Sequence, residues 1–227
     1  MVGGVSELTL LTPIKPGPIP GEIRTYEQRL RQELQFVQQR VDSGTPTVVS
    51  VIPTIHFARW QILRPEQYLQ LSGVTLNAIS PSDSQSQPNY HSWLLFCVSF
   101  DGDLQAYLRD FSVLVGSDVD KIWGNCEGYP AGGAKDFEDY WNYAKRYQIP
   151  TDVFYNAYPG FSVPHIHQLI TFKKRFDEFV AGTRKPDGRT VDEVAALFDE
   201  FLKDNSTYTQ NFPSAGGIFA DRVVTAE

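Results

Sequence analysis

The sequence predicts an α+β protein in which a four-stranded antiparallel sheet carries its helices on one face and is followed by a helical extension. Three observations lead to this prediction. Apolar, strand-like runs occur at 6–12, 55–63 and 92–100. After the first and the third of these runs, apolar residues recur every three or four positions, which is the spacing of a helix. A further strand-like run at 121–127 completes the order strand, helix, strand, strand, helix, strand.

The first strand and the first helix have clear ends. The strand at 6–12 stops at Pro13, because proline cannot donate to a sheet ladder. The helix after it ends at Ser43-Gly44, a typical C-terminal stop. Its apolar side recurs at three- and four-residue steps and comprises Ile23, Tyr26, Leu30, Leu34, Val37 and Val41.

The middle of the chain contributes two strands with a polar segment between them. In 55–63 (IHFARWQIL), alternation sends one set of side chains to one face and the other set to the opposite face. Residues 73–90 are rich in Ser, Asp, Gln and Pro and are expected to form a loop. The nearly continuous apolar run at 92–100 is typical of a central strand buried on both faces. The alternating sets are His56, Ala58, Trp60 and Ile62 against Phe57, Arg59 and Gln61.

The second half of the sheet region begins with a turn at Asp101-Gly102, where Asp101 or Asp103 can cap the next helix. Residues 121–127 (KIWGNCE) are interpreted as the fourth strand. This element order is the split β-α-β arrangement of a ferredoxin-like sheet. Its uncovered face needs a partner, and we expect a second copy of the chain, hence a homodimer. The C-terminal helices within one chain are the alternative cover.

We expect three regions: a ferredoxin-like core at 1–130, a helical extension at 131–205 and an irregular tail at 206–227. The extension holds an aromatic helix around 137–147 and an extended or strand-like piece at 152–158. Two further helices follow. Ser162 can cap the first of them, and Thr190 with Glu193 forms a capping box for the second.

Composition narrows the function classes. The net charge of -7 argues against a nucleic-acid surface. No long uncharged apolar run suggests a membrane span, and the N-terminus shows no secretory pattern, so a cytoplasmic location is expected. Both thiols are then expected to be reduced, with Cys97 in the core. Cys126 is expected to be buried and inert, because Glu127 disfavours the thiolate.

His56 and Arg59 are the candidate catalytic residues, because they stand in an otherwise apolar strand. His56 could act as a base or ligate haem iron, or it could simply be hydrogen-bonded across the sheet. Arg59 could hold a carboxylate, or pair with an acid such as Glu127. No metal site is expected, since His165 and His167 diverge on a helix.

The aromatic residues on strand-like segments are the candidate ligand-binding residues, since flat apolar molecules bind to such side chains. The alternative is that they fill the core and the sheet interface. The set comprises Trp60, Trp123, Tyr155 and Tyr158.

Three segments, 56–60 (HFARW), 124–130 (GNCEGYP) and 154–160 (FYNAYPG), resemble a bacterial group of the dimeric α/β-barrel superfamily, over roughly residues 5–180. That superfamily includes antibiotic-type monooxygenases without a cofactor, and chlorite dismutases and dye-decolourising peroxidases, which bind haem. The resemblance implies a ferredoxin-like dimer, oxidative chemistry and haem as a cofactor to test. The peroxidase motif Gly-x-x-Asp-Gly lacks its first glycine at 98–102, so Asp101-Gly102 is interpreted as a turn and cap.

The predicted function is therefore binding of a small apolar or aromatic molecule, with a monooxygenase-like or peroxidase-like reaction as its enzymatic form. The alternative is a non-catalytic structural or interaction protein whose aromatic residues serve packing and dimerisation only.

Overall fold

The computed structural model describes residues 5–67, 91–183 and 188–209. The loop expected at 73–90 lies outside the described residues. The chain forms two compact units, 1–163 and 164–227, so the expected boundary at 130 falls inside the first unit. The elements of the first unit are β1 (Val5–Pro13), α1 (Tyr26–Asp42), β2 (Ile55–Leu63), β3 (Trp93–Asp101), α3 (Leu104–Trp123), η2 (Gly133–Lys135), α4 (Phe137–Tyr147) and β4 (Gln148–Ile149).

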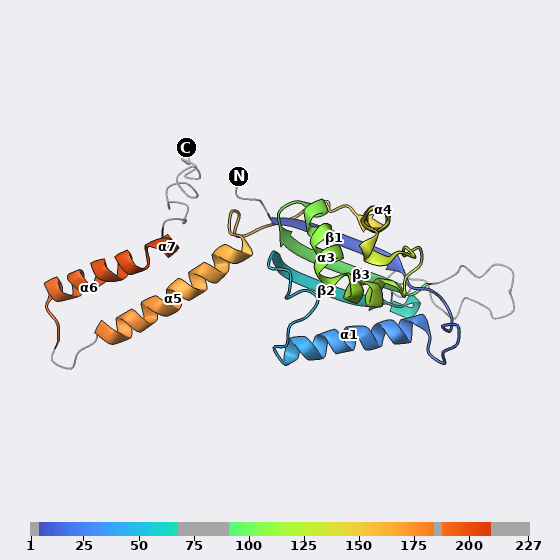
Figure 1. The fold of residues 1–227 in the computed structure, drawn as a ribbon, viewed down its shortest axis with the longest axis horizontal. Helices are drawn as coiled ribbons and strands as arrows, with labels where there is room; N and C mark the ends of the chain where they lie inside the picture. Colours follow the sequence, from blue (N-terminus) through green and yellow to red (C-terminus); the bar gives the residue numbers. More distant parts are fainter. Residues whose placement is uncertain (1–4, 68–90, 184–187, 210–227) are drawn as a thin grey trace. The chain divides into compact units, whose positions relative to one another are not determined.

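The first unit is built on a four-stranded sheet with the strand order β2-β3-β1-β4 (Figure 1). Every neighbouring pair is antiparallel. The predicted α+β class is thereby confirmed, as are the first three strands and the central place of β3. Helix α1 starts later than its apolar pattern suggested, because Thr25 and Gln28 form a capping box, and Ile23 is fully exposed before it.

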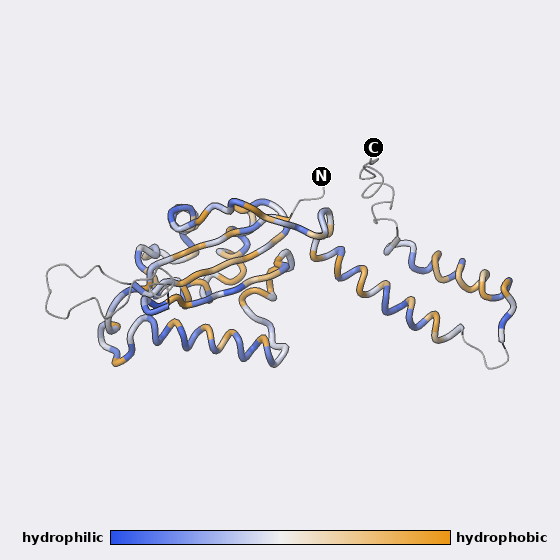
Figure 2. Tube along the Cα trace, turned by 180° about the vertical axis from the view of Figure 1, so that it is seen from behind, coloured by the Kyte–Doolittle hydropathy of each residue, from blue (hydrophilic) through white to orange (hydrophobic). Residues whose placement is uncertain are grey.

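One face of the sheet forms the core with the helices. The inward side chains of β3 are Leu94, Phe96, Val98 and Phe100, all buried. They pack in one cluster with buried residues of α3, with Leu30 of α1 and with the tyrosines of α4. In Figure 1, α3 crosses this face, α1 lies beside β2 and α4 lies beside β1. Figure 2 shows the apolar residues concentrated on the central strands.

The opposite face of the sheet is only partly buried in the first unit. Trp93, Leu95 and Cys97 of β3 alternate with the core residues and are partly exposed. Phe57 of β2 keeps 77% of its surface exposed. The expected burial of β3 on both faces is therefore wrong, and so is the expected core position of Cys97. A continuous apolar run does not by itself distinguish a strand buried on both faces from one with an open apolar face.

The fourth strand is not where the sequence suggested. Residues 121–123 continue α3, because Val119, Ile122 and Trp123 keep the helical spacing of its buried side. Gly124 ends the helix, and Cys126 makes only an isolated bridge to Ile14. The strand that pairs with β1 is the two-residue β4, which follows α4.

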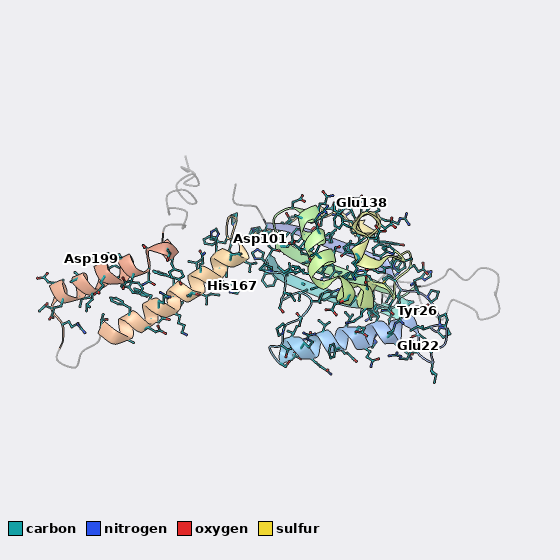
Figure 3. The ribbon with its side chains drawn as sticks, viewed as in Figure 1. Glu22, Tyr26, Asp101, Glu138, His167 and Asp199 are labelled. Atoms are coloured by element: carbon teal, nitrogen blue, oxygen red, sulfur yellow. The ribbon has the colours of Figure 1, made fainter. Side chains whose placement is uncertain are left out.

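The turn after α3 is fixed by the buried Asn125. Its amide donates to the carbonyl of Lys121 at 2.7 Å, and its Oδ1 accepts from Nε of Arg29 on α1 at 2.7 Å. Lys15 donates to the carbonyl of Gly124 at 2.8 Å. Glu22 and Tyr26 stand at the start of α1 (Figure 3), where Glu22 pairs with Arg29 at 3.3 Å. The 124–130 segment thus ties α1 to α3.

Three helices follow: α5 (Val163–Thr183), α6 (Val191–Asp204) and the short α7 (Ser206–Thr209). The second unit begins at Pro164, so it contains all of α5 except its first residue. The predicted capping box of Thr190 and Glu193 is confirmed. The expected irregular tail therefore begins with a helix, while 210–227 lie outside the described residues. Phenylalanine rings join α5 to α6, where Phe201 contacts Phe176 edge-on and Phe179 in a tilted arrangement. None of the helices in the described ranges is long and apolar enough to cross a membrane.

Candidate functional site

Two adjoining hollows lie between α1, the 44–50 segment and β2. Their volumes are about 490 and 240 Å³, and both have Val41, Val49 and Ala58 in their walls. We refer to the pair as the α1–β2 groove. Ligand pockets for small molecules have volumes of about 300–1,000 Å³ and mostly apolar linings, so the groove falls in this range. Its other apolar lining residues are Leu34, Val37, Pro46, Ile55 and Trp60, and polar residues including Gln38, Thr45, Thr47 and Ser50 also line it.

His56 lines the larger hollow of the groove. It sits at a β-bulge, because Ile55 pairs with Phe100 and Phe57 pairs with Ser99, which leaves His56 without a cross-strand partner. A bulge redirects the side chain of the extra residue. Here Nε2 of His56 comes within 2.8 Å of Oδ1 of Asp101, at the end of β3 (Figure 3).

The pair of His56 and Asp101 is largely buried, with 11% of each side chain exposed. The second carboxylate oxygen of Asp101 accepts a hydrogen bond from the backbone N–H of Val163 at 2.8 Å. Each oxygen of this carboxylate therefore has one donor. An ionised carboxylate only accepts, so Nε2 of His56 is the donor in this hydrogen bond, and in the neutral ring Nδ1 keeps its lone pair.

An imidazole held in this way can take up a proton at Nδ1, because the adjacent carboxylate stabilises the imidazolium that forms. Of the two alternatives for His56, the cross-sheet hydrogen bond is therefore present, and it does not exclude a base. The residue that the sequence analysis missed is Asp101, which was interpreted as a turn or cap. The cap is Asp103, whose Oδ1 accepts from the N–H groups of Gln105 and Ala106.

Arg59 forms no ion pair with Glu127, the acid named for it. Arg59 lines the smaller hollow, but its guanidinium donates to Sγ of Cys97 on the opposite, open face at 3.8 Å. Glu127 instead lies beside His91, with 3.6 Å between its Oε1 and Nδ1 of the histidine.

The four aromatic candidates fall into three environments. Trp60 lines the smaller hollow, and its ring lies 4.9 Å from that of Phe96 between centroids. Trp123 is buried in the core, and its ring lies 5.2 Å from that of Phe96 and 6.4 Å from that of Trp60 between centroids. Tyr155 and Tyr158 are 83% and 70% exposed and line neither hollow, so only Trp60 belongs to the groove. Residues 152–158 form no strand.

The indole nitrogen of Trp60 is shielded from a ligand. Its Nε1 is buried and has no hydrogen-bond partner among the residues that the structure describes. A buried donor without an acceptor costs about 1–3 kcal/mol. Nε1 of Trp123 in the core is also buried without a partner among the described residues, and neither nitrogen has a surface that a ligand could contact.

The two cysteines are free thiols with different surroundings. Burial raises the pKa of Cys126 to about 11, and Glu127 adds to the increase, although the hydroxyl of Thr12 and the charge of Lys15 oppose it. The expectation of a buried, inert thiol is confirmed for Cys126. Cys97 is partly exposed on the open face of the sheet.

Within the described ranges, no group of three or more His, Cys, Asp or Glu side chains could hold a metal ion. His165 and His167 both lie in the first turns of α5, where residues two apart diverge, as predicted.

Comparison of the chain with models of known families, with curated proteins and with solved structures finds no match.

Proposed function

We propose that this protein binds a small apolar or aromatic molecule in the α1–β2 groove, and that His56, oriented by Asp101, is the polar group that acts on it. The observation that carries the proposal is the largely buried His56–Asp101 pair, whose histidine lines the larger hollow of the groove. A structural role alone does not require an imidazole at such a place, because a buried polar pair stabilises little more than apolar side chains of similar size.

We also infer that the first unit is ferredoxin-like. The strand order β2-β3-β1-β4 with antiparallel neighbours is the order that a split β-α-β unit produces when both helices cover one face. The resemblance of the sequence segments to the dimeric α/β-barrel superfamily supports the same inference. A cytoplasmic location remains a prediction.

The proposed homodimer forms through the open face of the sheet. Leu95 and Cys97 of the central strand and the exposed Phe57 lie on that face. Exposed apolar sheet faces mark interaction surfaces, and a second copy of the same face would meet it in a two-fold arrangement. Cys97 is the natural probe, because it is a free thiol near the middle of this face.

The enzymatic form of the proposal is an oxidative reaction. Nδ1 of His56 takes the proton of a phenolic or enolic hydroxyl, and Asp101 stabilises the imidazolium. The anion that remains is electron-rich and adds dioxygen at a ring carbon to give a hydroperoxide. Loss of water from the hydroperoxide leaves a quinone, so one oxygen atom enters the product, the other leaves as water, and the substrate supplies the electrons.

Haem is a second, separate proposal that comes from the resemblance. One observation fits it: His56 has a carboxylate on one ring nitrogen, as metal-bound histidines commonly do, and keeps the other nitrogen available. A haem group would supply redox chemistry at the iron. The charged end of Arg59, proposed for a propionate, lies on the other face of the sheet and does not fit a haem in the groove.

The alternative function is a non-catalytic interaction protein. The packed cluster of Phe96, Trp60 and Trp123 favours it, because these rings fill the core beside the groove. Under this alternative the groove binds nothing, and the open sheet face is the functional surface.

The test is binding of 1-naphthol, a flat phenol, followed by the fluorescence of the protein. We expect saturable binding that Ala58→Phe abolishes, because this residue lines both hollows. Gln61→Phe on the same strand, at an exposed position of the other face, is the matched control. Binding that survives Ala58→Phe would place the ligand elsewhere and contradict the proposal.

Two further measurements separate the chemical forms. Oxygen consumption with 1-naphthol that is lost in His56→Ala supports the oxidative reaction. Addition of haem that gives a saturable Soret band, absent in His56→Ala, supports the haem proposal. Naphthol binding with neither signal leaves a binding protein without these reactions.

A further inference from the structure

Strand β2 forms one edge of the sheet, at the end of the strand order β2-β3-β1-β4. An edge strand presents a row of N–H and C=O groups that an added strand can pair with. The α1–β2 groove follows this edge, because its lining includes Ile55, His56, Ala58, Arg59 and Trp60 of β2. The edge and the groove therefore form one continuous surface.

A backbone hydrogen bond at the end of the sheet fixes which residues of β2 face outward. The N–H of Ile14 donates to the carbonyl of Ser92 at 2.8 Å. In an antiparallel ladder, such a bond lies beside a pair of residues that do not bond to each other, here Pro13 and Trp93. The backbone groups of Trp93 therefore point to its other neighbour, Leu63 of β2.

Alternation from Leu63 gives the outward residues of β2, since the register is regular back to Phe57. Every second residue bonds to β3, and the residues between them turn their N–H and C=O groups to the outer edge. Ala58, Trp60 and Ile62 are these outward residues, because each lies an odd number of positions from Leu63. Their outward groups form no backbone hydrogen bond with any residue that the structure describes.

The smaller hollow of the groove reaches these groups. Ala58 and Trp60 line it, and so does Arg59, whose guanidinium lies beside Cys97 on the open face. Because the hollow contacts neighbouring residues whose side chains belong to both faces, it extends along the edge of the strand. Helix α1 forms the opposite wall with Leu34, Val37, Gln38 and Val41.

An extended peptide matches this surface. Outward groups recur at every second residue, about 7 Å apart, and an added strand offers donors and acceptors at the same spacing. In an antiparallel hydrogen-bonded pair, the two side chains lie on the same face, about 5 Å apart. Peptide residues that pair with Ala58 and Trp60 therefore send their side chains into the hollow, where apolar or aromatic groups fit.

Arg59 adds a preference of charge. Its side chain is exposed beside the edge, and its hydrogen bond is to Sγ of Cys97, a weak acceptor. An acidic side chain directly opposite Arg59 on the added strand would form a cross-strand ion pair. We therefore expect an acidic residue between the two peptide side chains that enter the groove.

A second copy of the chain fits this edge less well. Helix α1 lies beside β2 (Figure 1). Two β2 strands paired about a two-fold axis would form a joined sheet with both α1 helices on the same face, and each helix would be directed into the space of the other. A single peptide strand brings no helix with it.

We propose that an extended segment of a partner protein adds to the sheet at β2, with two apolar or aromatic side chains in the α1–β2 groove and an acidic residue between them. The inference rests on the proposed function, because it identifies the carrier of the apolar or aromatic group as a peptide. The added strand runs antiparallel to β2, as all neighbouring strands of this sheet do.

The probe is the peptide acetyl-Thr-Val-Asp-Phe-Thr-Val-amide, titrated into the full chain by calorimetry. We expect saturable binding that 1-naphthol competes with and that Ala58→Phe abolishes. N-methylation of the phenylalanine should weaken binding about tenfold or more, because its N–H donates to β2. N-methylation of the threonine that follows should change binding by less than about twofold, since that N–H points away from β2.

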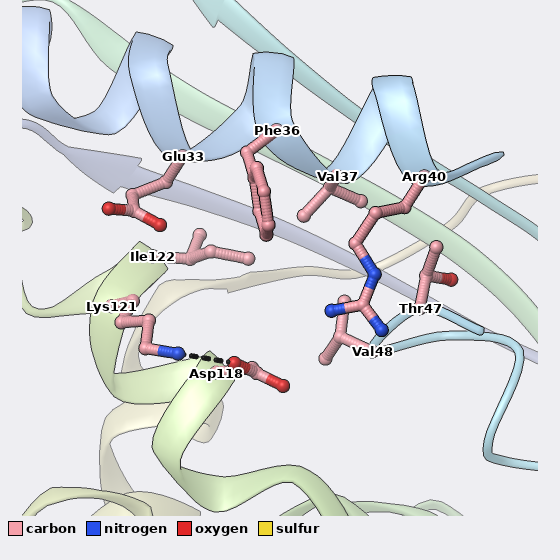
Figure 4. Close-up of a pocket in the computed structure, with 9 residues that line it drawn as sticks. All are labelled: Glu33, Phe36, Val37, Arg40, Thr47, Val48, Asp118, Lys121 and Ile122. Carbon is pink, nitrogen blue, oxygen red and sulfur yellow. Dashed lines mark hydrogen bonds and ion pairs between the residues drawn. The ribbon is translucent and has the colours of Figure 1, made fainter. Parts of the chain in front are cut away.

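A pair of charge variants tests the position of the acidic residue. Arg59→Gln should weaken binding about threefold and remove the preference for Asp over Asn in the peptide. Lys121→Gln is the matched control, because Lys121 is also an exposed base but lines the separate hollow of about 70 Å³ between α1 and α3 (Figure 4). This control should leave binding unchanged.

Three results would overturn the inference while the proposed function stands. The first is a chain that binds 1-naphthol but not the peptide, and the second is equal binding of the two N-methylated peptides. The third is a dimer of the chain that the peptide dissociates, which would assign the edge to a second copy. A chain that binds neither 1-naphthol nor the peptide would contradict both proposals.

Discussion

The energetic coupling between His56 and Asp101 is the sharpest test of the candidate site. Asp101→Ala removes the acceptor of two hydrogen bonds, one from Nε2 of His56 and one from the N–H of Val163. His56→Ala removes only the first. Because both side chains are 11% exposed, each single substitution leaves a largely buried polar group without its partner.

The size of the effect follows from these contacts. A hydrogen bond to a charged group contributes about 1.5–3 kcal/mol, and an unsatisfied buried group costs about 1–3 kcal/mol. We therefore expect Asp101→Ala to lower the free energy of unfolding by about 2–4 kcal/mol and His56→Ala by about 1–3 kcal/mol. In the double variant the loss should be smaller than the sum, with a coupling energy of about 1–2 kcal/mol.

The assay is urea unfolding followed by tryptophan fluorescence. All four tryptophans, Trp60, Trp93, Trp123 and Trp141, lie within the first unit. The signal therefore reports on this unit without a contribution from the second, which can unfold separately.

Asp120→Ala is the matched control for this cycle. Asp120 is also a carboxylate that accepts two hydrogen bonds, from Tyr129 at 2.6 Å and from the N–H of Ala134 at 2.8 Å. Its effect should add to that of His56→Ala. A coupling energy between His56 and Asp101 below about 0.5 kcal/mol, no larger than the usual error of additivity, would refute the reasoning.

Three further predictions concern stability and thiol chemistry. Gly133→Ala should lower the free energy of unfolding by about 1–3 kcal/mol, because φ is +68° and the new Cβ would lie 2.7 Å from a carboxylate oxygen of Asp120. Burial raises the pKa of Glu27, but hydrogen bonds from two arginines and a serine outweigh it, so this pKa is lowered. Its contribution to stability is present above about pH 4.3, the ordinary pKa of glutamate, and is lost as the pH falls through the folded pKa. Glu27→Gln should flatten that part of the acid unfolding curve. At pH 8 a thiol reagent should modify Cys97 in dilute monomer and more slowly at concentrations where the proposed dimer covers the open face, and it should leave Cys126, with a pKa of about 11, unmodified until the protein unfolds.

Local patterns predicted the elements with strong periodicity. The strand 55–63 has the bounds of β2, and the capping box of Thr190 and Glu193 begins α6. In both cases the information lies in a few adjacent residues. The prediction of the fourth strand was wrong because the deciding information does not lie in adjacent residues. Lys121-Ile122-Trp123 is apolar enough for a strand, but these residues extend the buried side of α3, whose spacing starts at Tyr107.

The candidate site was predictable only in part. His56 was identified because it is a polar residue in an apolar strand, and it does line a groove. Its partner is 45 residues further along the chain, and no local pattern specifies that distance. Alternation along the strand also correctly placed Arg59 on the face opposite to Trp60. It could not show that the guanidinium of Arg59 donates a hydrogen bond to the thiol of Cys97 on β3.

The β-bulge explains why this strand carries its site. In a regular ladder, each residue of β2 faces one partner on β3, and its side chain points either into the core or to the open face. The bulge at His56 adds a residue without a partner, so the imidazole reaches Asp101 at the end of β3 while Ile55 keeps its place against the core. Removal of one residue at this point would restore a regular ladder and take the histidine out of the groove. The bulge, rather than the histidine alone, is therefore the feature that makes the groove a candidate site.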